Sequence, residues 1–276
     1  MSSLVVDTNL SAISAYNALN ATDQNMSKAI QQLSTGLSVQ TAADGPAAYV
    51  QSQALQSQAN GYQQAISNAQ DGVSLVQTAS GALNQISSIL QTMNQLALNS
   101  ANGATQDSTS LAANQQEFSA LQNDINQIAA TTSYGTTNLL SGSFSQVLQV
   151  GAFDNANNQV NLQISGATTS DLNVASGSVS VSSTTAAQAA LSAVQLAITK
   201  VDTIEASVGA VQNELQAIAA NLTVGQQNLT AANSQLVNVN MAQEMTTFST
   251  DQILMQTGTS MLAQAQQAPQ LVLKLI

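Results

Sequence analysis

The sequence predicts a mainly α-helical protein, with long antiparallel coiled-coil helices from both chain halves and a small β-hairpin insertion between them. Apolar residues recur with a seven-residue period in both halves of the chain. Apolar residues make up 44% of the chain and aromatic residues only 3%, which suits thin helix–helix seams better than one thick core. A short middle segment alternates with period two instead, which indicates strands.

The first half of the chain carries a helical pattern that is interrupted once. The seam of the first 37 residues holds Ala12, Tyr16, Leu19, Met26, Ile30, Leu33 and Leu37, with Asp23 as the one polar residue among them. Asp44-Gly45-Pro46 predicts a break, because proline disfavours helix in the residue before it. A second helix then continues to about Ser100, with a seam of Leu75, Ala79, Ala82, Ile86, Ile89, Met93 and Leu96. Asn102-Gly103 ends it, and a third helix is expected over residues 108–130.

The middle of the chain, from Tyr134 to about Thr185, lacks the seven-residue period of the two halves. Residues 147–151 and 160–164 are separated by the Asn-rich stretch 154–158, which predicts a β-hairpin. The pattern leaves open a second short strand pair around residues 172–181.

The second half carries the clearest helical pattern, with two seam positions that stay apolar or Gly over about seven heptads. One position holds Val194, Val201, Val208, Leu215, Leu222, Leu229 and Leu236. The other holds Ala190, Ala197, Ile204, Val211, Ile218, Gly225, Ala232 and Val239. The phase shifts near Asn240, where Met241, Met245 and Phe248 take over. We expect one helical stretch of roughly 85 residues, about 120 Å long, that stops at Pro269.

The composition excludes several function classes. A net charge of −11, with three lysines and no arginine, argues against binding nucleic acid or anionic membranes. Without His or Cys, the chain lacks the residues of the common catalytic triads and of His- or Cys-based metal sites. We therefore expect no enzyme activity, cofactor or metal. The sequence contains no run of 18 apolar residues, so we expect no membrane-spanning helix. The first residues do not have the pattern of a cleaved signal peptide.

Short motifs along the whole chain appear in one characteristic order. They are LSTGL at 33–37, TAAD at 41–44, QTMNQLA at 91–97, LQNDI at 121–125, YGTTNLL at 134–140, LQVG at 148–151, VGAVQNEL at 208–215, NMAQE at 240–244 and QILMQTG at 252–258. In sequence and order, these motifs resemble bacterial flagellin.

The resemblance implies a filament subunit that leaves the cell through the flagellar type III export apparatus. The protein would be secreted and extracellular, in a helical homopolymer, with an export chaperone, a cap and hook-junction proteins as partners. The implied division is 1–42 for the N-terminal inner-layer (D0) helix, 43–138 for the helices of the next layer (D1), 139–185 for the β-hairpin insertion, 186–235 for the C-terminal D1 helix and 236–276 for the C-terminal D0 helix. The outer domains of longer flagellins would be missing.

The resemblance and the heptads together predict two sets of packing residues. The D0 seams, expected to contact other subunits, comprise Tyr16, Leu19, Met26, Ile30, Leu33, Leu37, Met241, Met245, Phe248, Leu254 and Met261. The D1 coiled-coil seam comprises Ile86, Ile89, Met93, Leu96, Val208, Leu215, Leu222, Leu229 and Leu236.

The arginines of the family's motifs are missing. Thr92 and Asn94 stand where the family's corresponding motif carries Arg, and Glu214 replaces a third. In the family, the first of these stretches is read by the vertebrate innate receptor for flagellin. The altered segment, Gln91, Thr92, Asn94, Gln95 and Leu96, predicts weak recognition.

Two questions stay open at this point. The low charge is consistent with a filament adapted to acid, because few cations would remain to repel one another there, or with compositional drift or selection for a neutral surface. The alternatives to a filament subunit are a hook–filament junction protein, which would share the terminal helices, and a secreted coiled-coil protein of another kind.

Overall fold

The computed structural model describes residues 8–273, with side chains as far as residue 267, and in this range it has five long helices. They are α1 (Leu10–Thr35), α2 (Pro46–Ser100), α3 (Ser108–Thr131), α4 (Thr184–Val237) and α5 (Met241–Leu273). Two antiparallel pairs of strands and a 3-10 turn lie between α3 and α4: β1 (Ser133–Tyr134), β2 (Thr137–Asn138), β3 (Phe144–Gln149), η1 (Ala156–Asn158) and β4 (Gln159–Ile164). The predicted fold class is confirmed.

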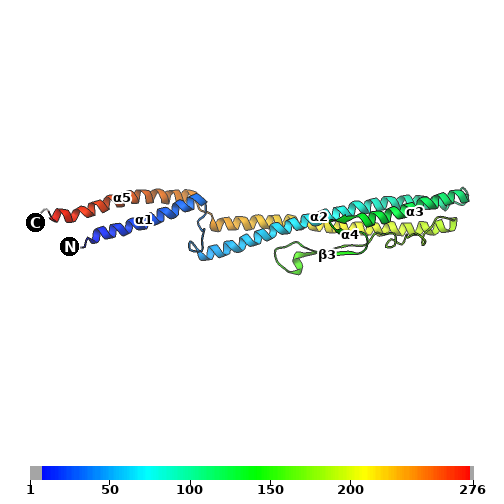
Figure 1. Ribbon diagram of the computed structural model, residues 1–276, viewed down its shortest axis with the longest axis horizontal. Coiled ribbons are helices and arrows are strands. Elements are labelled where there is room, and N and C mark those ends of the chain that lie inside the picture. The colour runs from blue at the N-terminus through cyan, green and yellow to red at the C-terminus, as the bar shows by residue number, and fades with distance from the viewer. Residues whose placement is uncertain (1–7, 274–276) are drawn as a thin grey trace. The chain divides into compact units, whose positions relative to one another are not determined.

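The chain divides into two compact units. We call residues 58–228 the central unit, and residues 1–57 with 229–276 the terminal unit. In the terminal unit, α1 and α5 lie side by side and run antiparallel (Figure 1). The central unit holds most of α2 and α4, all of α3 and the strands (Figure 1).

Both ends of α1 are held by local hydrogen bonds. The Asn9 side chain accepts the Ala12 backbone N–H at 3.1 Å, which caps the start of the helix. Its amide nitrogen also donates to the Ala265 carbonyl at 2.7 Å and so joins α1 to α5. At the other end, Gly36 adopts φ 74° and its N–H bonds to the Gln32 carbonyl, because glycine enters this left-handed conformation without strain.

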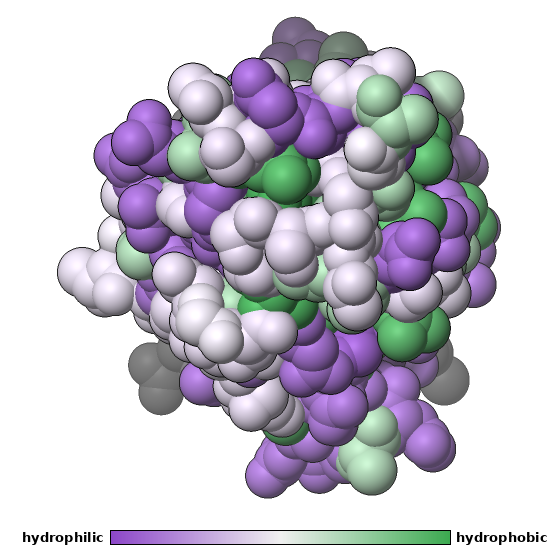
Figure 2. Space-filling view, turned by 90° about the vertical axis from the view of Figure 1, so that its right-hand side faces the viewer, coloured by the Kyte–Doolittle hydropathy of each residue, from purple (hydrophilic) through white to green (hydrophobic). Residues whose placement is uncertain are grey.

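The core of the central unit is built on the predicted seam of α2. Leu83, Ile86, Leu90 and Met93 are fully buried there, and Phe118 of α3 joins them. The seam of α4 closes the core with Val194, Val201, Val208 and Leu215. The face of the molecule seen in Figure 2 is mainly hydrophilic or intermediate, with hydrophobic residues in small separate patches.

The β3–β4 hairpin forms where alternation predicted it, and one face of it is buried. In β4, Val160, Leu162 and Ile164 are buried, while the residues between them are exposed. Gly72 of α2 allows close packing, because a Cβ there would overlap the side chain of Leu148 in β3.

The second strand pair left open for residues 172–181 does not form. This segment consists of turns, and its apolar residues are buried against the helical core. Side chains of α3, and not a second strand, form hydrogen bonds with backbone groups of this segment. Gln122, which is buried, donates to the Val174 carbonyl at 2.8 Å, and Gln115 accepts the Val181 N–H at 2.6 Å.

The expectation of an uninterrupted C-terminal helical stretch was wrong, because residues 238–240 separate α4 from α5, at the place where the sequence showed the phase shift near Asn240. Ser38 N–H donates to the Val237 carbonyl at 2.7 Å, and Val239 N–H donates to the Gly36 carbonyl at 2.9 Å. The backbone that would continue the helix is thus paired with the chain after α1. Leu37 lies in this connection, beyond the end of α1, and forms a β-bridge with Asn238.

The predicted stop at Pro269 was also wrong, since α5 continues to Leu273. A proline removes one helical hydrogen bond and can bend a helix, but it need not end it.

Candidate assembly interface

The seam between α1 and α5 is formed by half-buried or buried residues spaced alternately three and four apart, as in a coiled coil. In α1 they are Ala12, Ala15, Leu19, Thr22, Met26, Ala29 and Leu33. In α5 they are Glu244, Phe248, Asp251, Met255, Gly258, Leu262 and Ala265. The helices pack closely, because a Cβ on Gly258 would lie 3.1 Å from Leu19 Cδ1.

Only part of the predicted D0 seam belongs to this intramolecular seam. Leu19, Met26, Leu33 and Phe248 are in it. Six others are 48–55% exposed: Tyr16, Ile30, Met241, Met245, Leu254 and Met261. The prediction selected large apolar side chains, whereas the actual seam alternates large residues with Ala, Gly and Thr, whose small side chains allow the helices to approach. A search for the three-four spacing that accepts small as well as large residues would have found it.

The six residues are not the only exposed large apolar residues of α1 and α5 in the described range. Leu10, Ile13 and Ile253 are exposed as well and were missed in the sequence reading. We call all nine residues the apolar surface of the terminal unit. Isolated surface leucines are ordinary, but nine exposed large apolar side chains on two helices make this part of the chain a candidate interface.

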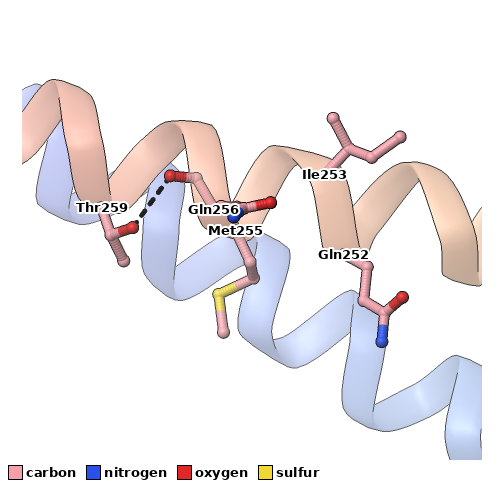
Figure 3. Close-up of a pocket in the computed structure, with 5 residues that line it drawn as sticks. All are labelled: Gln252, Ile253, Met255, Gln256 and Thr259. Carbon is pink, nitrogen blue, oxygen red and sulfur yellow. Dashed lines mark hydrogen bonds between the residues drawn. The ribbon is translucent and has the colours of Figure 1, made fainter.

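A shallow depression of about 410 Å³ lies on α5 and includes Ile253 of this surface. Gln252, Ile253, Met255, Gln256 and Thr259 line it (Figure 3). Ile253 points away from α1, whereas Met255 points toward it (Figure 3). The Thr259 hydroxyl is already engaged with the Gln256 carbonyl at 2.9 Å, so the depression offers mainly apolar contact and amide groups.

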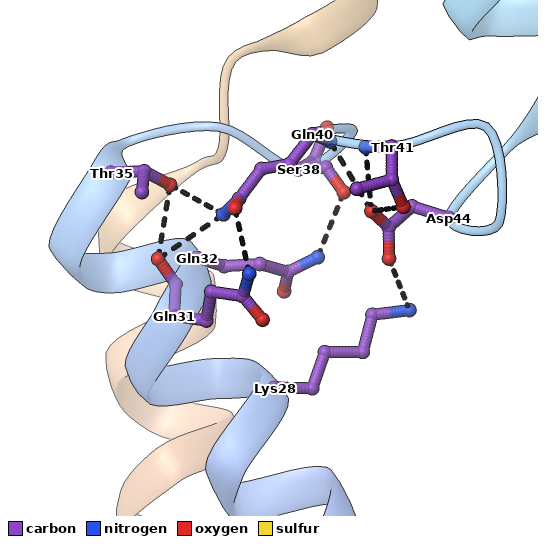
Figure 4. Close-up of polar contacts among 8 residues, drawn as sticks. All are labelled: Lys28, Gln31, Gln32, Thr35, Ser38, Gln40, Thr41 and Asp44. Carbon is purple, nitrogen blue, oxygen red and sulfur yellow. Dashed lines mark hydrogen bonds and ion pairs between the residues drawn. The ribbon is translucent and has the colours of Figure 1, made fainter.

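The connection after α1 is held by a polar network (Figure 4). The Asp44 carboxylate accepts the Thr41 N–H and the Thr41 hydroxyl, both at 3.0 Å, and the Gln40 N–H at 3.3 Å. Lys28 of α1 forms an ion pair with Asp44 at 3.6 Å. Gln32 adds a bond to the Ser38 carbonyl at 2.9 Å. These contacts fix the chain against the last turns of α1.

The network should loosen in acid. The Thr41 N–H and hydroxyl, then the Gln40 N–H and the Lys28 ammonium, favour the carboxylate and hold the pKa of Asp44 below its ordinary value. Because this pKa is lowered by folding, the stabilisation is fully present above the ordinary aspartate pKa of about 3.9. It is lost as the pH falls through the lower pKa of the folded protein.

An NMR titration of the Asp44 carboxyl carbon would measure this effect. We expect its midpoint below that of the same residue in a peptide of residues 38–48, and Thr41→Val should bring the two midpoints closer. A folded midpoint at or above that of the peptide would contradict the described network.

The α1–α5 seam contains one carboxyl group that the described structure leaves without a partner. Asp251 is 7% exposed, and its Oδ2 is buried with no hydrogen bond to any described residue. A buried polar group without a partner costs about 1–3 kcal/mol in proteins.

Replacing this side chain by leucine should therefore stabilise the terminal unit. Asp251→Leu is expected to raise the thermal midpoint and helical circular dichroism of the monomer, and Asp251→Asn to have a smaller effect, because the amide remains polar. The matched control is Thr250→Leu at the exposed neighbouring position. A lower midpoint for Asp251→Leu would mean that the carboxylate has a stabilising partner.

The predicted D1 seam is largely inside the molecule. Ile86, Met93, Val208, Leu215 and Leu222 are buried. Ile89, Leu96, Leu229 and Leu236 are half-buried, and the last two belong to the part of α4 in the terminal unit.

The altered receptor-like segment lies on α2. Gln91, Thr92 and Gln95 are exposed, whereas Leu96 packs against the core. The side-chain oxygen of Asn94 is buried without a hydrogen-bond partner among the described residues. The exposed part of this segment therefore presents amides and a hydroxyl and carries no positive charge.

Among residues 8–273, no group of three or more Asp or Glu side chains is placed to hold a metal ion. Within the same range, no helix combines the length and the apolar character that crossing a bilayer requires.

Comparisons with known proteins identify the family. The model of the bacterial flagellin N-terminal helical region matches residues 6–145, and that of the C-terminal helical region matches residues 191–276. The chain belongs to the bacterial flagellin family.

Two relatives and one solved structure illustrate the match. Flagellin B of Vibrio cholerae serotype O1 is 42% identical over 119 residues, which are 43% of this chain and 31% of that protein. The flagellin of Clostridium tyrobutyricum is 42% identical over 121 residues, 44% of this chain and 32% of that protein. The matched part of this flagellin thus spans about a third of the length of these relatives.

The solved structure is of a protein described as a flagellar hook-associated protein from Vibrio parahaemolyticus. It is 15% identical, with a TM-score of 0.59, over 71% of this chain and 100% of that one. At this identity the likeness concerns the fold alone.

Proposed function

We propose that this flagellin is a structural, non-enzymatic subunit that polymerises through its terminal helices into the extracellular flagellar filament for swimming motility. The observation that carries the proposal is the apolar surface of the terminal unit, nine large apolar residues exposed on α1 and α5. Copies of the chain packed helix against helix would cover this surface. Contacts between different faces that do not close into a ring produce an open helix.

The two units support a layered subunit. The terminal unit, which includes the proposed divisions 1–42 and 236–276, would form the inner layer (D0) of the filament. The central unit would form the next layer (D1), with helices in 43–138 and 186–235 and the hairpin insertion in 139–185. Within D0, the nine exposed residues would meet other copies, and the α1–α5 seam would hold the subunit together.

The proposed partners follow from this role. Export in an unfolded state through the type III apparatus requires a chaperone for the apolar C-terminal helix. Growth at the distal end requires a cap, and attachment requires hook-junction proteins. The sparse seam between α1 and α5 is compatible with a terminal unit that completes its folding on assembly.

Electron microscopy of the purified protein tests the proposal. The full-length chain, depolymerised by heat and then seeded or salted out, should form long filaments of uniform width. A version without residues 1–40 and 236–276 should remain monomeric. Full-length protein that stays monomeric, or that forms only short rings, would contradict the proposal.

The second candidate is a hook–filament junction protein. The fold likeness to the Vibrio parahaemolyticus protein is the observation that keeps it open. Copy number separates the two functions, because junction proteins are needed in small amounts. Quantitative mass spectrometry of isolated flagella should find this chain in large excess over other flagellar components if it is the filament subunit.

We further propose that the innate receptor recognises this flagellin weakly. Thr92 and Asn94, which stand where the family's motif carries arginine, cannot form the ion pairs that arginine forms there. A receptor-reporter assay should show activation only at doses well above those of an ordinary flagellin. Full activation at ordinary doses would refute the prediction, and restoring the arginines with Thr92→Arg and Asn94→Arg should raise the response.

A further inference from the structure

We propose that Lys200 and the pocket around it in the central unit bind a carboxylate side chain from a second copy of this chain. The inference rests on the proposed filament function and names one contact within the polymer. Lys200 is the only basic residue among residues 58–228.

The pocket is an open depression of about 530 Å³. Its lining combines the buried apolar side chains of Leu172 and Ile204 with polar residues, among them Ser143, Ser165 and Asp171. An acidic side chain could place its aliphatic carbons against Leu172 and Ile204 and its carboxylate near Lys200.

The ammonium group of Lys200 is held in place but not neutralised. It donates to the backbone carbonyl of Asp171 at 3.0 Å. The Asp171 carboxylate is turned to Thr168, from which it accepts the hydroxyl at 2.7 Å and the N–H at 3.3 Å. Within the described part of the chain, the one ion pair joins Lys28 to Asp44. Lys200 therefore keeps an unpaired charge and two N–H donors.

The hydroxyl groups of the pocket divide into occupied and available ones. Thr199 and Thr203 donate to carbonyls of their own helix, at 3.1 and 2.8 Å. Ser143 and Ser165 are exposed and form no side-chain hydrogen bond with the described residues. They and Lys200 provide hydrogen-bond donors around one pocket, which matches the needs of a carboxylate.

The charge balance of the chain identifies the partner. The central unit has nine carboxyl groups for its single lysine: Asp71, Asp107, Glu117, Asp124, Asp154, Asp171, Asp202, Glu205 and Glu214. Most of them are exposed, so any second copy presents carboxylates. Copies with a net charge of −11 repel one another. A contact that places a carboxylate of one copy beside the unpaired ammonium group of Lys200 in another would lower this repulsion between copies.

Zero-length cross-linking with a carbodiimide tests the contact, because the reagent joins an amine to a carboxylate only when the two touch. The chain has three lysines and its amino terminus, so a cross-link at Lys200 is identified by mass spectrometry with little ambiguity. Filaments grown from mixed unlabelled and ¹⁵N-labelled full-length chains distinguish links between copies from links within one copy. We expect mixed-label links from Lys200 to an Asp or Glu in filaments, and none in monomers.

Substitution of the lysine provides a second readout. Lys200→Gln should raise the critical concentration for polymerisation roughly tenfold, the effect of one charge-assisted hydrogen bond. Lys200→Arg should largely restore it, and Gln195→Ala, an exposed position on α4 outside the pocket lining, should leave it unchanged. Equal monomer circular dichroism for all variants would show that folding is not the cause.

The outcomes separate this inference from the proposed function. Filaments in which Lys200 links only within its own copy, and a Lys200→Gln chain that polymerises like the original, would overturn the inference and leave the filament function intact. An original chain that forms no filaments at all would overturn both.

Discussion

Replacing Tyr16, Ile30 and Met245 by serine together is expected to abolish filament growth while the monomer keeps its helix content. These side chains are about half exposed, so removing them costs the isolated subunit little. Full burial of such a side chain contributes about 1.5–3 kcal/mol, so covering the exposed half between subunits contributes roughly half of that. Losing three of them should raise the critical concentration about a hundredfold or more. Light scattering after seeding, with electron microscopy, measures the effect.

The matched control uses exposed polar residues of the same two helices. Asn17→Ser, Asn20→Ser and Gln264→Ser remove side chains without removing apolar surface, so this triple variant should polymerise like the original chain. If the apolar triple variant polymerised equally well, the terminal unit's apolar surface would not be the assembly interface.

Leu83→Ala should destabilise the central unit by about 2–5 kcal/mol, because it removes a fully buried side chain from the α2 seam and leaves a cavity. This is a large fraction of the stability of a typical domain. Urea unfolding of the monomer, followed by circular dichroism, should show a lower midpoint with little change in slope.

Leu98→Ala on the same helix provides the control. Leu98 is 59% exposed, so its truncation should change the unfolding free energy by no more than about 0.5 kcal/mol. If the two variants were equally destabilised, the burial pattern of α2 described above would be incorrect.

The sequence predicted the helices well because their causes are local. The break at Asp44-Gly45-Pro46 and the end near Asn102-Gly103 are reproduced by α2, which begins at Pro46 and ends at Ser100. The heptads of α2 and α4 predicted a core that is fully buried, since large aliphatic residues at seam positions leave one face of each helix for burial.

The sequence predicted less about the candidate interface. Tyr16 and Ile30 were assigned to the same seam as Leu19 and Met26, although they lie outside the α1–α5 contact. Spacing alone allows either set, because neighbouring stripes of a helix can both carry apolar residues. The choice depends on how closely the partner helix approaches, and the close packing of Gly258 against Leu19 shows that approach at one point of the seam.

The sequence by itself determined the fold class, the extents of α2 and α3, the β3–β4 hairpin, the absence of His and Cys chemistry and the family. Each follows from residue types, their local spacing or their order along the chain. Only the tertiary structure decided that the phase shift near Asn240 is a break in the helix, that residues 172–181 form turns and that Asp251 is buried. These depend on partners distant in sequence: Ser38 for Val237, Gln122 for Val174 and α1 for Asp251. A hydrogen bond or a contact between distant segments leaves no periodic signal in either of them.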